Sequence, residues 1–145
     1  MGQLFEHYPN KTIVIYKDKQ VVFTSEEKGV RPMMVYMDTY GPSEEPLTVI
    51  DRIVGRGAVI LALLINAKTI KTPLISESAM ELAEHHGLTV EAEKVVPYII
   101  NRQGDGRCPI ESAVLGMTDV DEGYAAIKAA IAKLMAGSES SHGQG

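Results

Sequence analysis

The chain has 145 residues and a mass of 15.8 kDa, and it is 45% hydrophobic and 23% charged, values that predict one globular domain. The net charge of -5 and the pI near 5.3 argue against nucleic acid or an anionic membrane as the main partner. Cys108 is the single cysteine, which excludes an intramolecular disulfide and a multi-cysteine zinc site and is typical of a reducing compartment.

The N-terminus is polar and acidic, whereas a secretory signal peptide is basic and then apolar. The longest nearly apolar stretch, Ala58–Ala67, is too short to cross a bilayer. We therefore expect a cytoplasmic protein with no membrane partner.

The first half of the chain predicts a hairpin followed by helices. Two β-branched and aromatic runs, Thr12–Tyr16 and Val21–Thr24, flank a polar turn and predict a pair of antiparallel strands. Pro32 predicts the start of a short helix rich in methionine, with a strand as the alternative. Gly41–Pro46 predicts an exposed loop because its glycine and prolines interrupt regular structure. The apolar spacing of Val49–Asn66 predicts a long buried helix.

The second half predicts alternating strands and helices. Thr69–Ile75 is expected to be a strand, followed by a helix capped by Ser76 or Ser78, with Ser78 to Glu81 as a capping box. Two further strands are expected at Thr89–Glu93 and Val95–Ile100.

The C-terminal part predicts two more helices and a tail. Pro109 opens a short helix, and Asp119 begins an amphipathic helix that continues through Leu134. Residues 137–145 are of low complexity and are expected to be disordered, so the single domain spans residues 1–136. This order of elements predicts an α/β protein, a three-layer α/β/α sandwich with a mixed sheet.

The loop between residues 101 and 111 is the first candidate site. Its two glycines allow several backbone N–H groups to converge on an anion, and the helix opened by Pro109 adds the positive end of its dipole. The alternative is a purely structural loop. The residues of this predicted anion site are Arg102, Gly104, Asp105, Gly106, Arg107 and Cys108.

Cys108 lies at the predicted cap of that helix and next to Arg107, a setting that favours a nucleophilic thiolate. Such a nucleophile needs a base, and the sequence places none of its four histidines beside the cysteine. The alternative is a half-buried structural cysteine.

Two further groups of polar residues begin predicted helices. Asp51, Arg52 and Arg56 lie in the first turns of the predicted buried helix, where Gly55 and Gly57 leave room for a ligand or another backbone to approach. The alternative is that these charged residues are simply solvated. Ser76 and Glu77, followed by Ser78, come after a strand and open a helix, a place where ligands bind in α/β sheets, although capping also explains the two serines.

Three motifs carry a resemblance to a known family. They are VIDRIVGRGA at 49–58, LISESA at 74–79, and NR-x-GDG-x-CP at 101–109. With these motifs the chain resembles an uncharacterised bacterial family, domain of unknown function 1893, from about Thr12 to Leu134. The resemblance implies a cytidine-deaminase-like fold. In that comparison the 49–66 helix corresponds to the helix with the His-x-Glu motif of deaminases, and the helix after Ile75 to the one with Pro-Cys-x-x-Cys.

Both deaminase motifs are absent from this chain. A zinc deaminase needs three His or Cys ligands and a Glu that shuttles protons, and this chain has Asp51-Arg-Ile and Ser76-Glu-Ser-Ala at those positions. We therefore expect no zinc, no other cofactor, and no deamination by the zinc mechanism. The resemblance implies that the cleft remains, lined by Asp51, Arg56, Ser76 and Glu77 with the 102–108 loop as a third wall.

Three functional hypotheses follow. The first is a binding protein whose metal-free cleft takes a nucleotide or ADP-ribose-like anion. The second is an enzyme in which Cys108 is a nucleophile or Asp51 accepts a transferred group. The third is a structural homodimer formed through a sheet edge or the methionine-bearing segment, without a ligand.

Overall fold

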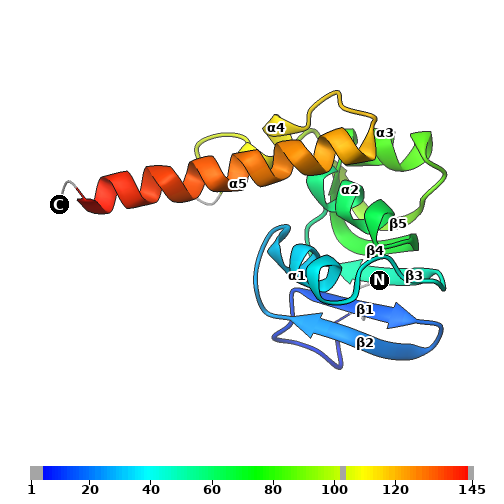
Figure 1. Cartoon of the computed structure of the whole chain (residues 1–145). Helices are drawn as coiled ribbons and strands as arrows, with labels where there is room; N and C mark the ends of the chain where they lie inside the picture. Colours follow the sequence, from blue (N-terminus) through cyan, green and yellow to red (C-terminus); the bar gives the residue numbers. More distant parts are fainter. Residues whose placement is uncertain (1–4, 102–103, 144–145) are drawn as a thin grey trace.

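Five strands form one mixed sheet in the order β2-β1-β3-β4-β5 (Figure 1). The computed structural model describes residues 5–101 and 104–143. The strands are β1 (Ile13–Lys17), β2 (Gln20–Ser25), β3 (Leu47–Asp51), β4 (Ala67–Ser76) and β5 (Thr89–Val96). β1 pairs antiparallel with β2 and β3, whereas β3, β4 and β5 are parallel. The predicted hairpin and the mixed sheet are confirmed.

Five helices are present in the described residues, and α2 lies at the centre of them. They are α1 (Arg31–Tyr40), α2 (Arg56–Leu64), α3 (Glu77–His85), α4 (Pro109–Ala113) and α5 (Val120–Gly143). α2 packs against α1, α3, α4, α5 and β4. Its nearly apolar sequence suits this position, because a helix that is hydrophobic all round must be covered on all sides. The helices predicted at Pro32, Pro109 and Asp119 are confirmed.

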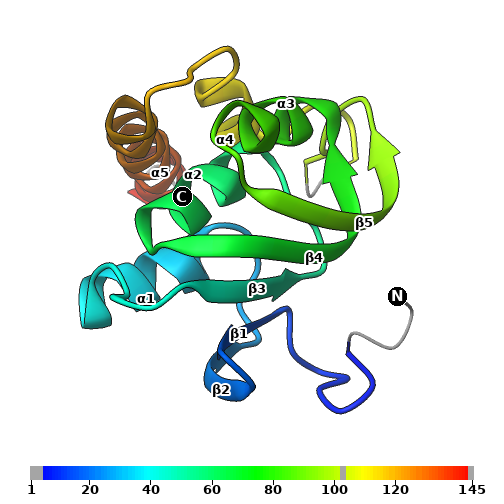
Figure 2. The ribbon, with the colours of Figure 1, turned by 90° about the vertical axis from the view of Figure 1, so that its right-hand side faces the viewer.

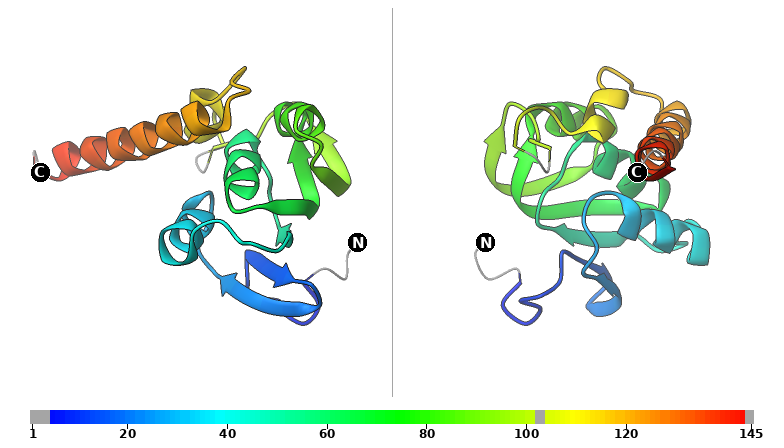
Figure 3. Two further views of the ribbon diagram at one scale, coloured as in Figure 1. Left: turned by 45° about the vertical axis from the view of Figure 1, so that its right-hand side comes forward. Right: turned by 90° about the vertical axis from the view of Figure 1, so that its left-hand side faces the viewer.

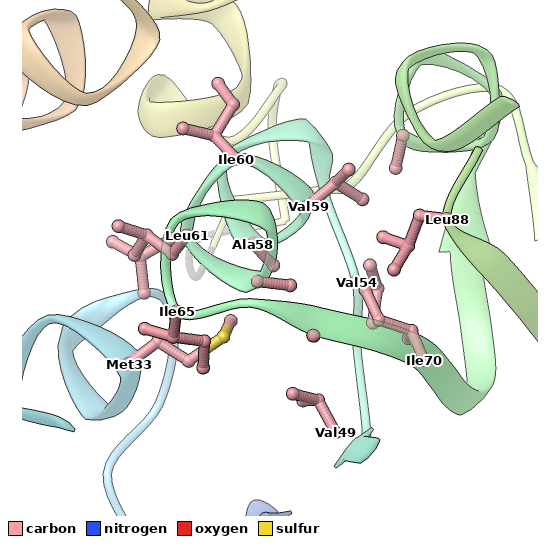
Figure 4. Close-up of a cluster of buried hydrophobic side chains, with 14 of the residues drawn as sticks. Met33, Val49, Val54, Ala58, Val59, Ile60, Leu61, Ile65, Ile70 and Leu88 are labelled. Atoms are coloured by element: carbon pink, nitrogen blue, oxygen red, sulfur yellow. The ribbon is translucent and has the colours of Figure 1, made fainter. Parts of the chain in front are cut away.

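The helices cover one face of the sheet (Figure 2). Side chains from β1, β3 and β4 on this face join residues of α1, α2, α3 and α5 in the main core, part of which is drawn in Figure 4. On the other face, the small cluster of Phe5, Val14 and Ile50 contains no helical residue. The N-terminal segment covers this cluster. Arg52 holds the segment in place: its guanidinium lies 3.9 Å from the centre of the Phe5 ring and donates hydrogen bonds to the Pro9 and Lys11 carbonyls.

The described residues therefore form two layers, and the predicted third layer is not found among them (Figures 2 and 3). The crossovers β3-α2-β4 and β4-α3-β5 both advance in the same direction across the sheet. Because such crossovers are right-handed, both helices must lie on the same face.

The prediction of one helix over Val49–Asn66 is wrong in its first part. β3 occupies Leu47–Asp51, and the helix begins only at Arg56, after a turn. Val49 is buried under the helices and Ile50 by the opposite cluster, so consecutive apolar residues here reflect burial on both faces of a strand. An apolar run of this kind does not distinguish a doubly buried strand from a helix.

Three other predicted boundaries differ from the structure. The expected strands Thr89–Glu93 and Val95–Ile100 are one strand, β5, which ends at Val96 because Pro97 lacks the N–H that a strand needs. Ile100 instead forms an isolated bridge with Arg107. α5 continues through Gly143, beyond the expected start of the tail at residue 137, because no proline interrupts it there. Residues 144 and 145 lie outside the described residues.

Candidate functional site

The N-terminus of α2 packs closely against α4. A Cβ atom on Gly55 would lie 3.0 Å from Glu111 Oε2, and one on Gly57 would lie 2.9 Å from Ile110 Cγ2. Larger residues would therefore push α4 away from α2. These glycines were expected to admit a ligand or another backbone, and in the structure they admit two side chains of α4.

Glu111 joins four segments of the chain. Its Oε2 accepts hydrogen bonds from the backbone N–H of Arg56 at 2.9 Å and from the hydroxyl of Ser76 at 2.5 Å. Its Oε1 accepts one from the backbone N–H of Ile99 at 3.0 Å. A carboxylate at the first turn of α2 also complements the helix dipole. Glu111 is buried, and these three donors satisfy the charge that burial would otherwise make unfavourable.

Ser76 is both a partner of Glu111 and the N-cap of α3, since its Oγ accepts from the Ala79 N–H at 3.1 Å. Of the two caps considered in the sequence, Ser76 is the one used. The capping box from Ser78 to Glu81 is wrong, because Glu81 turns instead toward Arg56.

The guanidinium of Arg56 connects α2, α3 and the segment before α5. It donates to the Met117 carbonyl from Nε at 3.1 Å and from Nη2 at 2.6 Å. Its Nη1 lies 2.8 Å from the Ser78 carbonyl, 3.1 Å from the Ser78 hydroxyl and 3.2 Å from Glu81 Oε1. The Arg56 side chain is 1% exposed and that of Glu81 is 70% exposed. Arg56 is therefore fixed mainly by carbonyl groups, and Glu81 is its exposed ionic partner.

These elements surround an open cleft of about 450 Å³. It lies at the carboxyl ends of the parallel strands, because α2 follows β3, α3 follows β4, and Pro97 follows β5. Three residues of the predicted site line it: Arg56, Glu77 and Arg107. Its other lining residues are Ser78, Glu81, Pro97, Leu115 and Gly116. Two cations and two carboxylates thus face the same volume.

The glycine-rich loop is held by its own hydrogen bonds. Asn101 Oδ1 accepts from the backbone N–H groups of Gly104 at 2.8 Å and Asp105 at 3.2 Å, and Asn101 Nδ2 donates to Asp105 Oδ1 at 2.9 Å. Two N–H groups expected to contact an anion are therefore already used. Arg102, also predicted for the anion site, lies outside the described residues.

Cys108 and Arg107 lie where this loop meets α4. The Cys108 N–H donates to the Ile99 carbonyl at 2.8 Å, and the residue is half-buried. The Arg107 guanidinium lies 4.6 Å from the centre of the Tyr98 ring, a cation–π contact that leaves the arginine exposed beside the cleft. His86 lies 2.7 Å from the Thr118 carbonyl, and within the described residues no hydrogen bond joins a histidine to Cys108.

Asp51 is buried at the end of β3, on the helix-covered face beside Ile13 of β1. Burial raises the pKa of its carboxyl to about 7, although backbone hydrogen bonds from Ile53 and Arg52 act in the opposite direction. Asp51 is not among the residues that line the cleft. Of the four polar residues expected on the first two walls, Arg56 and Glu77 line the cleft. Ser76 is buried and hydrogen-bonded to Glu111, and neither Ser76 nor Asp51 is among the lining residues.

The sequence reasoning missed Glu111 and Glu81 as site residues, and it considered Ser78 only as part of the helix start. Glu111 is an isolated acid in a five-residue helix, and no spacing rule relates it to Arg56 or Ser76. The pair Gly55 and Gly57 was the available signal, because two glycines around one arginine indicate that another segment approaches closely.

The fold and the cleft define a small α/β domain with a polar, mixed-charge depression at the ends of parallel strands. The chain matches the family model TM1506, domain of unknown function (DUF1893), over residues 4–131, and it therefore belongs to this family. A solved structure of a DUF1893 family protein (TM1506) from Thermotoga maritima is similar, with a TM-score of 0.77 and 25% identity over 90% of this chain and 85% of that chain. No curated protein matches the chain.

Two features are absent from the described residues: a membrane-spanning helix and a group of metal-binding side chains. No helix there is both long and apolar enough to span a membrane. In the same part of the chain, no three His, Cys, Asp or Glu side chains are grouped so that they could hold a metal ion.

Proposed function

We propose that the chain is a binding domain whose cleft takes a nucleotide-type anion, on a cytidine-deaminase-like fold that works without metal. The observation that carries the proposal is the convergence of Arg56, Glu77 and Arg107 on one cleft at the carboxyl ends of the parallel strands. Ligands of α/β sheets bind at such ends, where helix N-termini and loops meet.

Arg107 is the residue that recognises the anion. It is exposed, it is held beside the cleft by Tyr98, and its planar guanidinium suits the paired oxygens of a phosphate. The N-terminus of α3 opens onto the same volume and adds a favourable dipole. Arg56 contributes positive charge from the floor.

Glu77 gives the cleft a preference for a sugar phosphate over a bare phosphate. A carboxylate repels an anion but accepts hydrogen bonds from vicinal hydroxyl groups. Glu77 lines the cleft and, unlike Glu81, has no ion pair with Arg56 in the described residues. Leu115 and Pro97 supply apolar surface for a base. We leave Asp51 out of the binding set because it is buried away from this lining.

Isothermal titration calorimetry with ADP, ADP-ribose and inorganic pyrophosphate tests the proposal. We expect R107A to weaken all three ligands about tenfold or more, since a hydrogen bond to a charged group contributes about 1.5–3 kcal/mol. We expect E77A to weaken ADP and ADP-ribose but not pyrophosphate. The matched control is R31A, which removes an exposed arginine of α1 outside the cleft.

Binding must also stabilise the folded protein, so the melting temperature should rise with ADP concentration for wild type and R31A. If wild type binds none of the three ligands at millimolar concentration, the proposed function is wrong. If R107A binds as tightly as R31A, the cleft is not the site.

A further inference from the structure

We propose that a second copy of this chain docks on the surface formed by α1 and residues 131–135 of α5, giving a two-fold symmetric dimer. This inference concerns a different surface from the cleft and does not depend on the proposed function. It rests on four observations about α5 and the groove beside it.

The stripe of α5 that packs on the domain continues past the point where the domain ends. Gly123 is buried, and its Cβ position lies only 2.5 Å from Ile60 Cδ1, so α5 is packed tightly on α2 at this end. Ile127 is fully buried and Ile131 is half-buried. Leu134 and Met135 follow at helical spacing on the same stripe, yet they are 49% and 48% exposed.

The C-terminal part of α5 extends away from the rest of the molecule (Figures 1 and 3). Leu134 and Met135 come late in this helix, where Met135 still contacts Arg31 of α1. A helix gains most of its stability from packing an apolar face, and an isolated segment of a few turns is marginal in water. Leu134 and Met135 receive only part of that packing from their own chain, since about half of each side chain is exposed. A partner that covers Leu134 and Met135 would supply it.

An acceptor for these side chains lies next to them. A groove of about 280 Å³ runs between α1 and α5, with Met34, Val35 and Ile131 as its apolar lining and Glu27, Arg31 and Asp38 as its charged lining. Val35 is 47% exposed. Arg31 Nη2 lies 3.6 Å from Met135 Sδ, so the groove and the end of the stripe are contiguous.

The charges identify the occupant as a second copy. Within the described residues, neither Glu27 nor Asp38 forms an ion pair, and neither does Lys133, which precedes Leu134. The groove has two carboxylates and one guanidinium in its lining, and Lys133, beside the apolar knob formed by Leu134 and Met135, carries a positive charge that complements this excess of negative charge in a second copy. A patch that contains both a knob and its complementary groove can pair reciprocally about a two-fold axis, as isologous dimers do.

In this arrangement Leu134 and Met135 of each copy enter the groove of the other, and Lys133 of each copy faces Asp38 of the other. The fit of one apolar anchor into a pocket with a charged rim is the usual composition of a protein interface.

Sedimentation equilibrium of the full chain over a range of concentrations tests the proposal. We expect wild type to approach twice the 15.8 kDa chain mass. L134E should raise the dimer dissociation constant about thirtyfold or more, as for a hot-spot residue. The control I53E places the same charge on a side chain that is 52% exposed in the β3–α2 turn and should leave the mass unchanged. Circular dichroism shows whether L134E keeps its fold.

A charge-reversal pair distinguishes a second copy from any other occupant. K133E and D38K should each weaken the dimer, and the double variant K133E/D38K should restore it, because the two charges are exchanged across the interface. A wild-type chain that is monomeric at every concentration up to its solubility limit would overturn the proposal. So would a dimer that L134E leaves intact, or charge reversals whose effects simply add.

Discussion

The carboxylate of Glu111 offers the most direct test of how the site is held together. Its two oxygens accept three hydrogen bonds, from the backbone of Arg56, the hydroxyl of Ser76 and the backbone of Ile99. Glu111→Gln keeps the shape of the side chain but replaces one acceptor oxygen by an NH₂ donor. Whichever way the amide is turned, its NH₂ faces an N–H or O–H donor on one side.

The expected cost follows from that count. A buried donor left without an acceptor costs about 1–3 kcal/mol, so Glu111→Gln should lower the free energy of unfolding by about 2 kcal/mol. Glu111→Ala leaves both backbone N–H groups without the carboxylate and should cost about 3–5 kcal/mol. Because a domain of this size has a total stability of about 5–15 kcal/mol, the alanine variant is close to the limit of folding.

Urea unfolding followed by circular dichroism measures both values. Glu84→Gln, an exposed acid of α3, is the matched control and should change the free energy of unfolding by less than about 0.5 kcal/mol. A double-mutant cycle with Ser76→Ala should show strong non-additivity, since the two side chains share a hydrogen bond. If Glu111→Gln unfolds at the same urea concentration as the control, the carboxylate does not hold the four segments together.

Three further predictions concern other buried or shared groups. Because burial raises the pKa of Asp51 to about 7, the folded state retains a proton that the unfolded state has lost, so stability should fall by a few kcal/mol from about pH 4 to pH 8. Asp51→Asn should flatten that dependence, which urea unfolding at three pH values measures. The prediction is contradicted if the free energy of unfolding changes equally with pH in both proteins. Glu81→Ala frees Arg56 Nη1 of its carboxylate partner and should tighten pyrophosphate binding a few-fold by calorimetry, whereas no change would mean that Glu81 does not compete with the ligand. Gly123→Ala should destabilise the chain by about 1 kcal/mol in urea, because the clash with Ile60 exceeds the gain in helix propensity, and a stabilised variant would refute that close approach.

The hairpin and the proline-started helices were predictable because local signals and tertiary packing agree there. The β-branched runs around Lys17-Asp18-Lys19-Gln20 pair with each other directly, and Pro32 and Pro109 stand in the first turns of their helices. The secondary structure of such segments can be predicted without knowing which distant residues pack against them.

The stretch that begins at Val49 shows the opposite case. Its apolar residues satisfy a helical pattern, but β3 is placed by pairing with β1, more than thirty positions earlier, and with β4. Two partners and two buried faces override the local pattern. The error placed Asp51 in the first turns of a helix, whereas it lies at the end of a strand.

The candidate site was predictable only in its polar walls. Arg56, Glu77 and Arg107 were found because charged residues near helix starts and a glycine-rich loop are visible in the sequence. Their common support, Glu111, was not, since it acts through hydrogen bonds to backbone groups of distant segments. The role of Asn101 was hidden for the same reason: an amide that closes its own loop looks like any other loop residue.

The helices cover only one face of the sheet, and the opposite face has two halves that differ in their tolerance of substitutions and attached groups. Over β1 and β3, the segment that begins at Phe5 and is held by Arg52 covers Val14 and Ile50, together with the partly buried side chains of Tyr16 and Val21. Over β4 and β5, the outward residues include Thr69, Lys71 and Glu91, whose polar side chains are solvated by water. An affinity label or a fluorophore should therefore be attached on the β4–β5 half, whose surface residues cover no apolar cluster. Removal of the segment that begins at Phe5 would expose the apolar side chains of Val14 and Ile50 to water.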